Sequence, residues 1–333
     1  MSTRIVVASL MALMLCATGP ALGADQWITF EGGEGPGAGK HLVFVTGDDE
    51  YRSEESMPPM ARILAERHGF KCTVLFAISE ETGAIDPATL DNIPGLKALE
   101  SADLMLLFLR FRELGDKQMK RIMDYTNSGG PIVALRTATH PFNYSKDSDS
   151  RFAKWTWTSR DPSGGYGREV LGETWINHYG HHNVESTRGL VAQGMENHPI
   201  VRGCEDIWGP SDVYGIKALT GDSAPVIMGQ VLSGMNPTDG PAEGKELVPI
   251  AWTKTYTGTS GKASRVFTTT LGHSYDFKSE GVRRLLVNGI FWAAGMEDKI
   301  PERADVAFVG EYDPSNIGFG THKVGVMPAD HKL

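Results

Sequence analysis

Histidine is concentrated in three short polar segments of this sequence. Five of the ten histidines lie there: His140 in R-T-A-T-H, His178, His181 and His182 in H-Y-G-H-H, and His273 in L-G-H-S-Y-D. Imidazole is a common metal ligand, and it moves protons near neutral pH because its unperturbed pKa is ~6.5. We predict His140, His178 and His273 as catalytic residues and His178, His181 and His182 as ligands of a divalent metal such as zinc. Structural or sugar-binding imidazoles are the alternative.

Charged and aromatic side chains supply candidates for substrate binding. A guanidinium can hold a carboxylate or neighbouring hydroxyl groups, and aromatic rings present flat faces to a sugar ring. The predicted substrate-binding residues are Asp48, Glu50, Arg110, Arg136, Trp175, Tyr214 and Asp276. Ion pairing among the charged residues and packing of the rings inside the protein are the alternatives. For Asp212, a place in a turn is favoured over a role beside a histidine.

The segment from Arg136 to His140 directly follows the apolar run from Pro131 to Leu135. Open α/β sheets bind ligands beyond the carboxyl ends of such strands, so we expect the chemistry there. The segment contains neither cysteine nor serine, which argues against a nucleophile at this point. Cys72 and Cys204 do not lie beside a histidine segment. One disulfide between them is feasible after export, although a domain of this size does not need it.

Strand-like and helix-like segments alternate through the first part of the chain. Predicted strands cover residues 41–46, 71–77, 103–111 and 131–135, and later 248–254 and 264–271. Predicted helices cover residues 56–68, 116–128 and 279–296. This order predicts an α/β fold with a flavodoxin-like, doubly wound, mainly parallel sheet. Residues 141–245 are rich in Pro, Gly and Trp and are expected to form an irregular insertion, with short strand-like runs at 213–217 and 225–232.

The two ends of the chain are expected to lie outside this domain. Residues 1–24 combine Arg4, an apolar run and small residues, which is typical of a cleaved secretory signal. We therefore expect a periplasmic or secreted protein without stable membrane insertion. Residues 25–39 are Gly-rich and predict a flexible leader, residues 40–297 form the predicted α/β domain, and residues 298–333 are expected to form an extended tail.

The charge of the chain excludes several classes of partner. The formal net charge is -9, and loss of Arg4 with the leader makes it -10. An acidic protein without a basic run has no electrostatic surface for nucleic acid or for an anionic membrane. A small neutral molecule such as a carbohydrate fits this charge better.

Several segments together resemble the ThuA-like (trehalose utilisation) family. They are V-T-G-D-D-E-Y-R at 45–52, A-L-R-T-A-T-H-P-F at 134–142, N-H-P-I-V-R-G at 197–203, R-V-F-T-T-T-L-G-H at 265–273 and the later W-A-A-G. The resemblance covers residues 40–297 and implies a class I glutamine-amidotransferase-like fold. It also implies disaccharide catabolism, including the handling of oxidised (3-keto) sugars. His273 matches the family's Gly-His motif, and His140 is carried over from its histidine-bearing turn.

One departure from the amidotransferase pattern bears on the reaction. Amidotransferases carry a cysteine at the turn after the strand that matches residues 131–135, whereas this chain has Arg136 and Thr137 there. Glutaminase chemistry is therefore not expected. The leading hypothesis is a sugar-processing enzyme that uses histidines, assisted by a divalent metal, and that acts as a hydrolase, lyase or isomerase. The alternative is a non-catalytic sugar-binding or accessory protein.

Overall fold

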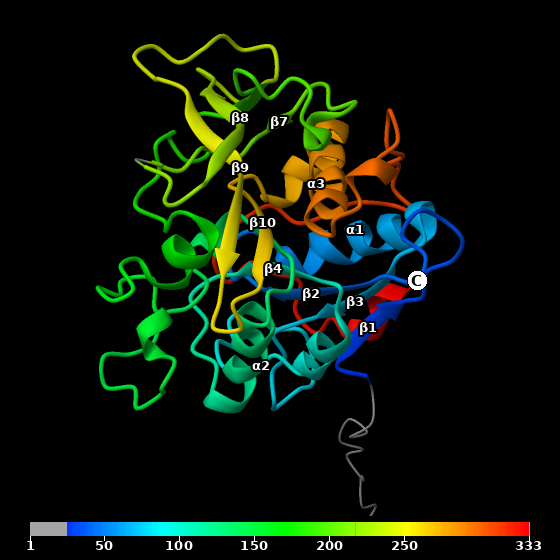
Figure 1. Ribbon diagram of the computed structural model, residues 1–333, viewed down its shortest axis with the longest axis vertical. Coiled ribbons are helices and arrows are strands. Elements are labelled where there is room, and N and C mark those ends of the chain that lie inside the picture. The colour runs from blue at the N-terminus through cyan, green and yellow to red at the C-terminus, as the bar shows by residue number, and fades with distance from the viewer. Residues whose placement is uncertain (1–24, 217, 333) are drawn as a thin grey trace, which may run out of the picture.

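The centre of the computed structural model, which describes residues 25–216 and 218–332, is a ten-stranded sheet (Figure 1). Its strands are β1 (Trp27–Phe30), β2 (His41–Gly47), β3 (Lys71–Leu75), β4 (Leu104–Leu109), β5 (Ile132–Leu135), β6 (Thr187–Val191), β7 (Trp208–Gly209), β8 (Ala224–Val231), β9 (Val248–Thr257) and β10 (Ala263–Thr269). The order across the sheet is β1-β3-β2-β4-β5-β10-β9-β8-β6-β7.

The sheet has a parallel part and an antiparallel part. Strands β3, β2, β4, β5 and β10 pair in parallel. β1 joins one side antiparallel, and β9, β8, β6 and β7 extend the other side antiparallel. Among the described strands, four of the nine neighbouring pairs are therefore parallel, and the prediction of a mainly parallel sheet is wrong. The fold is mixed α/β.

Helices cover both faces of the parallel part. α1 (Ser53–His68) and α3 (Glu280–Ala293) pack on one face, and α2 (Asp116–Asn127) packs on the other. Side chains alternate along β2 accordingly. Phe44 joins the core under α1 and α3, whereas Val43 and Val45 join the core under α2. This alternation of fully buried apolar residues explains why the strand reads as a continuous apolar run.

The predicted helices occur within a few residues of their expected positions. α1 differs most, because it begins at Ser53 rather than after an N-cap at Ser56. Its first residue follows Arg52, which adopts a left-handed conformation with φ 63° and offers no side-chain cap. The hydroxyl of Ser53 instead accepts a hydrogen bond from the Asp48 amide, 3.1 Å away. The loop after β2 therefore sets the start of this helix.

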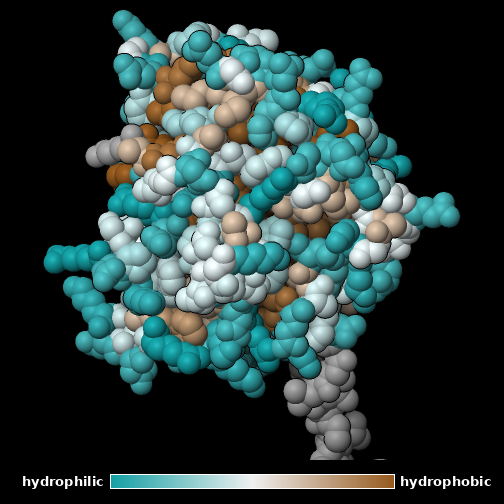
Figure 2. All heavy atoms as spheres, viewed as in Figure 1, coloured by the Kyte–Doolittle hydropathy of each residue, from teal (hydrophilic) through white to brown (hydrophobic). Residues whose placement is uncertain are grey.

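The segment expected to be an irregular insertion contributes strands to the sheet. β6, β7 and β8 lie within residues 141–245, and β8 pairs with β9 over most of its length. The run expected at 213–217 is not a strand among the described residues, and Tyr214 makes only an isolated bridge to His178. Figure 2 shows that apolar side chains on this face are most frequent in its upper part, where β8 and β9 lie.

The two ends of the described chain meet beside β3. Within the segment expected to be a flexible leader, β1 forms an edge strand paired with β3, so that expectation is corrected. At the other end the 3₁₀ turn η8 (Pro328–Lys332) lies next to β1, and Lys332 Nζ is 3.7 Å from the Asp25 carboxylate. The predicted signal at residues 1–24 falls outside the described residues.

Two further expectations concern cysteines and the membrane. Cys72 and Cys204 are both free, so the disulfide considered above is not formed. In residues 25–216 and 218–332, none of the helices has the length and apolar character that a bilayer span requires.

Candidate active site

Four of the five histidines singled out above gather near the carboxyl ends of β5 and β10. His178 and His182 have ring centroids 5.2 Å apart. Tyr51 connects them to His273, with its ring 6.3 Å from that of His182 and 6.4 Å from that of His273. On the other side, Tyr214 lies 5.5 Å from His178 and 6.1 Å from His140. We call His140, His178, His182 and His273 the histidine cluster.

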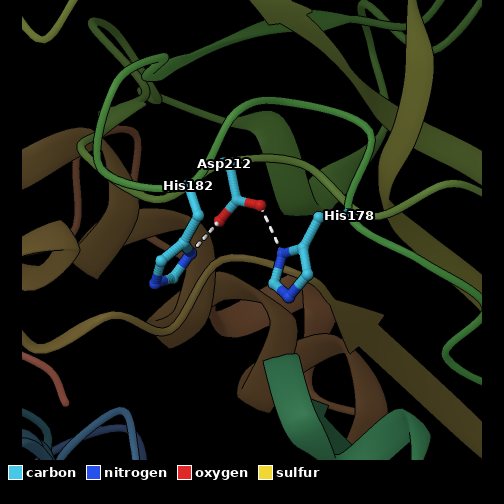
Figure 3. Close-up of side chains that lie close together, drawn as sticks. All are labelled: His178, His182 and Asp212. Carbon is cyan, nitrogen blue, oxygen red and sulfur yellow. Dashed lines mark hydrogen bonds and ion pairs between the residues drawn. The ribbon is translucent and has the colours of Figure 1, made fainter.

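Two members of the cluster share one buried carboxylate, that of Asp212 (Figure 3). His182 Nδ1 lies 3.1 Å from Oδ1, and His178 Nδ1 bonds to Oδ2. A carboxylate only accepts hydrogen bonds, so each Nδ1 carries a proton, and in the neutral form of each ring Nε2 holds the free lone pair. Figure 3 shows both rings on the same side of the carboxylate. The arrangement therefore presents two oriented imidazoles, each about one-third exposed, to one region.

Arg136 holds Asp212 in place through hydrogen bonds and an ion pair. Its Nη2 donates to Asp212 Oδ1 at 2.8 Å, and its Nη1 donates to the carbonyls of Asp212 and Thr270 at 3.0 and 2.9 Å. The guanidinium also lies over the rings of Tyr51 and Tyr214, 4.0 and 4.6 Å from their centroids. Burial alone would raise the pKa of Asp212, but its hydrogen bonds to the two histidines and the Arg136 charge hold that pKa well below its ordinary value.

Arg136 is therefore not available to a substrate. The residue is 0% exposed, and its backbone has φ 40° at the turn that directly follows β5. The predicted role in substrate binding is corrected to a positioning role, because both terminal nitrogens already donate to the protein. Tyr214, 1% exposed beneath the histidines, is likewise corrected from substrate contact to packing against Arg136.

Asp48 and Asp276 hold the loops that carry the cluster. Asp276 is fully buried and accepts hydrogen bonds from the amides of Gly272, His273 and Ser211 and from the Ser211 hydroxyl. It thus ties the loop after β10 to the segment that leads into Asp212. Asp48 is equally buried, and it accepts from the amides of Glu50 and Tyr51 and from the hydroxyl of Thr137. Their predicted contact with substrate is replaced by this structural role.

The two remaining members of the cluster are neutral imidazoles. Burial, with help from the Arg136 charge, lowers the pKa of His273 to about 3. His273 Nδ1 accepts the Tyr275 amide at 2.9 Å, which leaves the proton on Nε2. Burial and the nearby Arg110 likewise hold the pKa of His140 well below its ordinary value. The rings of His140 and His273 are therefore neutral before any proton exchange with a ligand.

Glu50 and Arg110 lie beside the histidines, and their side chains are 12% and 17% exposed. Glu50 Oε1 lies 3.8 Å from His182 Nε2, and Glu50 Oε2 lies 3.3 Å from Arg110 Nε. Arg110 also donates to Asp49 at 3.0 Å. Burial raises the pKa of Glu50, while the Arg110 charge opposes this rise. These two predicted substrate-binding residues thus keep a small exposed surface, unlike Arg136 and Tyr214.

Aromatic rings border the other side of the cluster. Trp175, also predicted from the sequence, lies 5.5 Å from the His140 ring and 5.8 Å from the His178 ring. Trp157 lies 5.6 Å from Trp175, and Phe111 lies 5.5 Å from Trp157 and 4.8 Å from His140. The three rings form a continuous apolar border that suits the C–H face of a sugar ring.

The predicted set of metal ligands changes by one residue. His181 is exposed and donates its backbone amide to Glu185, and it does not belong to the cluster. In the part of the chain that the structure describes, one group of side chains has donor atoms close enough together to hold a metal ion: His178, His182 and Asp212. Imidazole nitrogens with a carboxylate suit zinc and related ions. Because Asp212 already accepts a hydrogen bond from each imidazole, it also fits the role of a partner that orients the two rings.

Sequence reasoning missed two residues of this site. Asp212 stands in G-P-S-D-V, which is typical of a turn, and its partner Arg136 is 76 positions away. Tyr51 falls inside the family-like segment V-T-G-D-D-E-Y-R, which was the available signal for it. Its hydroxyl accepts from Arg136 Nη2 at 2.9 Å, and burial raises its pKa well above the ordinary value.

The fold and the site define a mixed α/β protein with a histidine cluster at the strand ends, and the comparisons with known proteins agree with this class. The family model ThuA, described as trehalose utilisation, matches residues 42–293. The chain belongs to the ThuA family. This confirms the resemblance stated from the sequence. A comparison with curated proteins found no match.

Two of the solved structures that match this chain are ThuA-like proteins. A ThuA-like protein from Parabacteroides merdae is 16% identical with a TM-score of 0.52, over 84% of this chain and 97% of that chain. A ThuA-like protein from Bacteroides uniformis is 15% identical with a TM-score of 0.47, over 78% of this chain and 93% of that chain. At such identity the first of these structures shows the fold alone.

Proposed function

We propose that this protein is a carbohydrate-processing enzyme that acts on a trehalose-type disaccharide or a keto-sugar through the histidine cluster. The family description, trehalose utilisation, supports the substrate class. The observation that carries the proposal is the shared carboxylate of Asp212, which binds the Nδ1 atoms of both His178 and His182 and so orients the two rings. Proteins commonly pair a carboxylate with an imidazole where the histidine binds a metal or transfers a proton.

The residues have distinct parts in this proposal. His178 and His182, with Asp212 beside them, would hold a divalent ion such as zinc, and when bound such an ion would polarise a sugar carbonyl or hydroxyl oxygen. His140, neutral and next to the pair, takes a proton from the substrate and returns it. Glu50 and Arg110 bind sugar hydroxyl groups, and the rings of Trp175 and Trp157 hold the apolar face of the sugar.

The test combines metal analysis with product analysis. Purified protein is assayed for bound metal and incubated with trehalose, other disaccharides and their 3-keto derivatives. We expect stoichiometric metal and turnover in the wild type, and loss of both in His178→Ala. His181→Ala serves as the matched control, because it removes an exposed imidazole of the same segment that lies outside the cluster. Unchanged metal content and turnover in His178→Ala would exclude this role for the cluster.

A second candidate function is non-catalytic sugar binding. It is favoured by the turn after β5, where a fully buried Arg136 stands in place of a nucleophile. Neither cysteine compensates, since burial raises the pKa of the Cys204 thiol to about 12 and Cys72 lies inside β3. Calorimetry separates the two functions. Disaccharide binding without any product after long incubation supports the accessory role, and detectable product excludes it.

Two finer assignments accompany the proposal. The parallel part of the sheet is of flavodoxin-like, doubly wound type, which is supported by the order β3-β2-β4-β5-β10 with helices on both faces. The protein is exported to the periplasm or medium, which the composition of residues 1–24 supports. Mass spectrometry of the protein from fractionated cells tests export, with an N-terminus near residue 24 expected in the exported fraction.

A further inference from the structure

The C-terminal tail is attached to two loops of the candidate active site. Gly318 donates its amide to the Glu50 carbonyl at 3.0 Å, and its own carbonyl accepts from Arg52 Nη2 at 2.6 Å. Further back in the tail, the Ser315 carbonyl accepts from the Ser274 hydroxyl at 2.8 Å. Glu50 lies in the loop after β2, and Ser274 follows His273 in the loop after β10. The tail is therefore held at a fixed position beside the histidine cluster.

This anchoring places one aromatic residue of the tail at the site. Phe319 directly follows Gly318, and the Arg110 guanidinium carbon lies 4.8 Å from the centroid of its ring. The same guanidinium lies 4.5 Å from the Phe111 ring, and its nitrogens reach Asp49 and Glu50. Phe319 nevertheless remains 57% exposed. A large aromatic ring is thus held against a site arginine while much of its surface faces solvent.

A short chain of contacts links Phe319 to the histidine pair. Arg110 touches Phe319 with its guanidinium and approaches Glu50 Oε2 at 3.3 Å, and Glu50 Oε1 approaches His182 Nε2 at 3.8 Å. Two side chains therefore separate the ring from the proposed reacting centre. A single sugar ring bound at the histidines would leave Phe319 uncovered, whereas a second ring linked to it would extend toward Phe319.

We propose that Phe319 is a specificity-determining residue, which receives the second ring of a disaccharide whose reacting ring lies at His178 and His182. This inference rests on the proposed function and narrows its substrate class to sugars of two or more rings. The apolar C–H face of the second ring covers the phenyl ring, and Arg110 binds its hydroxyl groups. Phe319 lies beyond residues 42–293, which the family model matches, so this preference belongs to the tail of this chain.

The experiment compares two-ring and one-ring sugars on single variants of the full chain. Binding and turnover are measured with trehalose and 3-ketotrehalose, and with glucose and 3-ketoglucose. Phe319→Ala is expected to raise Kd and KM for the two-ring sugars about 2- to 10-fold with kcat unchanged, and to leave the one-ring values unchanged. Phe319→Trp keeps a stacking surface and restores the wild-type values. Val324→Ala is the matched control, since Val324 is an 86% exposed apolar residue of the same tail.

The outcomes separate this inference from the proposed function. If the wild type binds and converts the sugars and Phe319→Ala behaves like Val324→Ala, the specificity role is excluded and the proposed function stands. Equal losses on one-ring and two-ring sugars also exclude it, because they indicate that Phe319 only positions Arg110. If the wild type neither binds nor converts any of the sugars, the proposed function fails and this inference fails with it.

Discussion

Glu54 gives a prediction that does not depend on knowing the substrate. This residue of the first turn of α1 is 7% exposed, and neither carboxylate oxygen has a hydrogen-bond partner among the described residues. It lines a cavity of about 160 Å³ together with Glu55, and the tail contributes Glu311 and Asp313 to the same wall. Burial raises the pKa of Glu54 from 4.5 to about 8, although the Arg52 charge opposes this rise.

The sign and size of the effect follow from proton linkage. The folded protein holds the Glu54 proton more tightly than the unfolded chain, so the contribution to stability is fully present below pH 4.5 and is lost as pH rises toward 8. A rise in pKa from 4.5 to about 8 corresponds to roughly 5 kcal/mol at ~1.4 kcal/mol for each pH unit. Glu54→Gln keeps the shape of the side chain and removes the ionisable proton.

The assay is urea unfolding of wild type and Glu54→Gln at pH 4.5, 6 and 8. The variant should match the wild type at pH 4.5 and become progressively more stable than it, by up to roughly 5 kcal/mol at pH 8. Glu66→Gln is the control, because Glu66 is an exposed glutamate of the same helix, and its profile should run parallel to the wild type. A constant difference between Glu54→Gln and wild type at all three pH values would refute the reasoning.

Three more outcomes are expected at the site. Asp212→Asn replaces one acceptor oxygen by an amide, so the imidazoles of His178 and His182 lose their fixed tautomers; metal content and turnover should fall at least 10-fold, and wild-type values would show that Asp212 does not orient them. Arg136→Ala removes the guanidinium paired with the buried Asp212 charge and should cost about 3–5 kcal/mol in thermal or urea unfolding, so a cost below 1 kcal/mol would contradict the assigned role. NMR titration should find His273 neutral down to about pH 4, because burial and Arg136 lower its pKa to about 3; a midpoint near pH ~6.5 would overturn its placement.

The parallel part of the fold was accessible from sequence because its strands are buried on both faces. Val43, Phe44 and Val45 are fully buried yet face two different cores, so the run is apolar at every position. β8 is only partly buried, and Gly229 and Gln230 interrupt its apolar pattern. Its pairing with β9 is set by contacts between distant segments, which a local pattern does not reveal.

The sequence allowed us to predict that the histidines of the candidate site lie together, but not which charged residues are buried and which are accessible. The expectation that separate histidine segments share one location follows from the shared edge of parallel strands, and the structure brings together four of the five. Arg136 and Arg110 look alike in sequence, since both stand near strand ends. Arg136 is buried against Asp212, whereas Arg110 lies beside Glu50. This difference depends on residues that are far away along the chain.

The ion pair between Lys332 and Asp25 brings the two ends of the described polypeptide within reach of each other's side chains. A short linker would join these positions, because the entropy cost of closing a loop grows only slowly with its length. Circular permutation should then be tolerated, with new termini opened in the exposed turn at Lys146 and Asp147. In such a permutant the tail is covalently attached at both ends. Its contacts with the loops after β2 and β10 should then be more stable, without any change to a residue of the site.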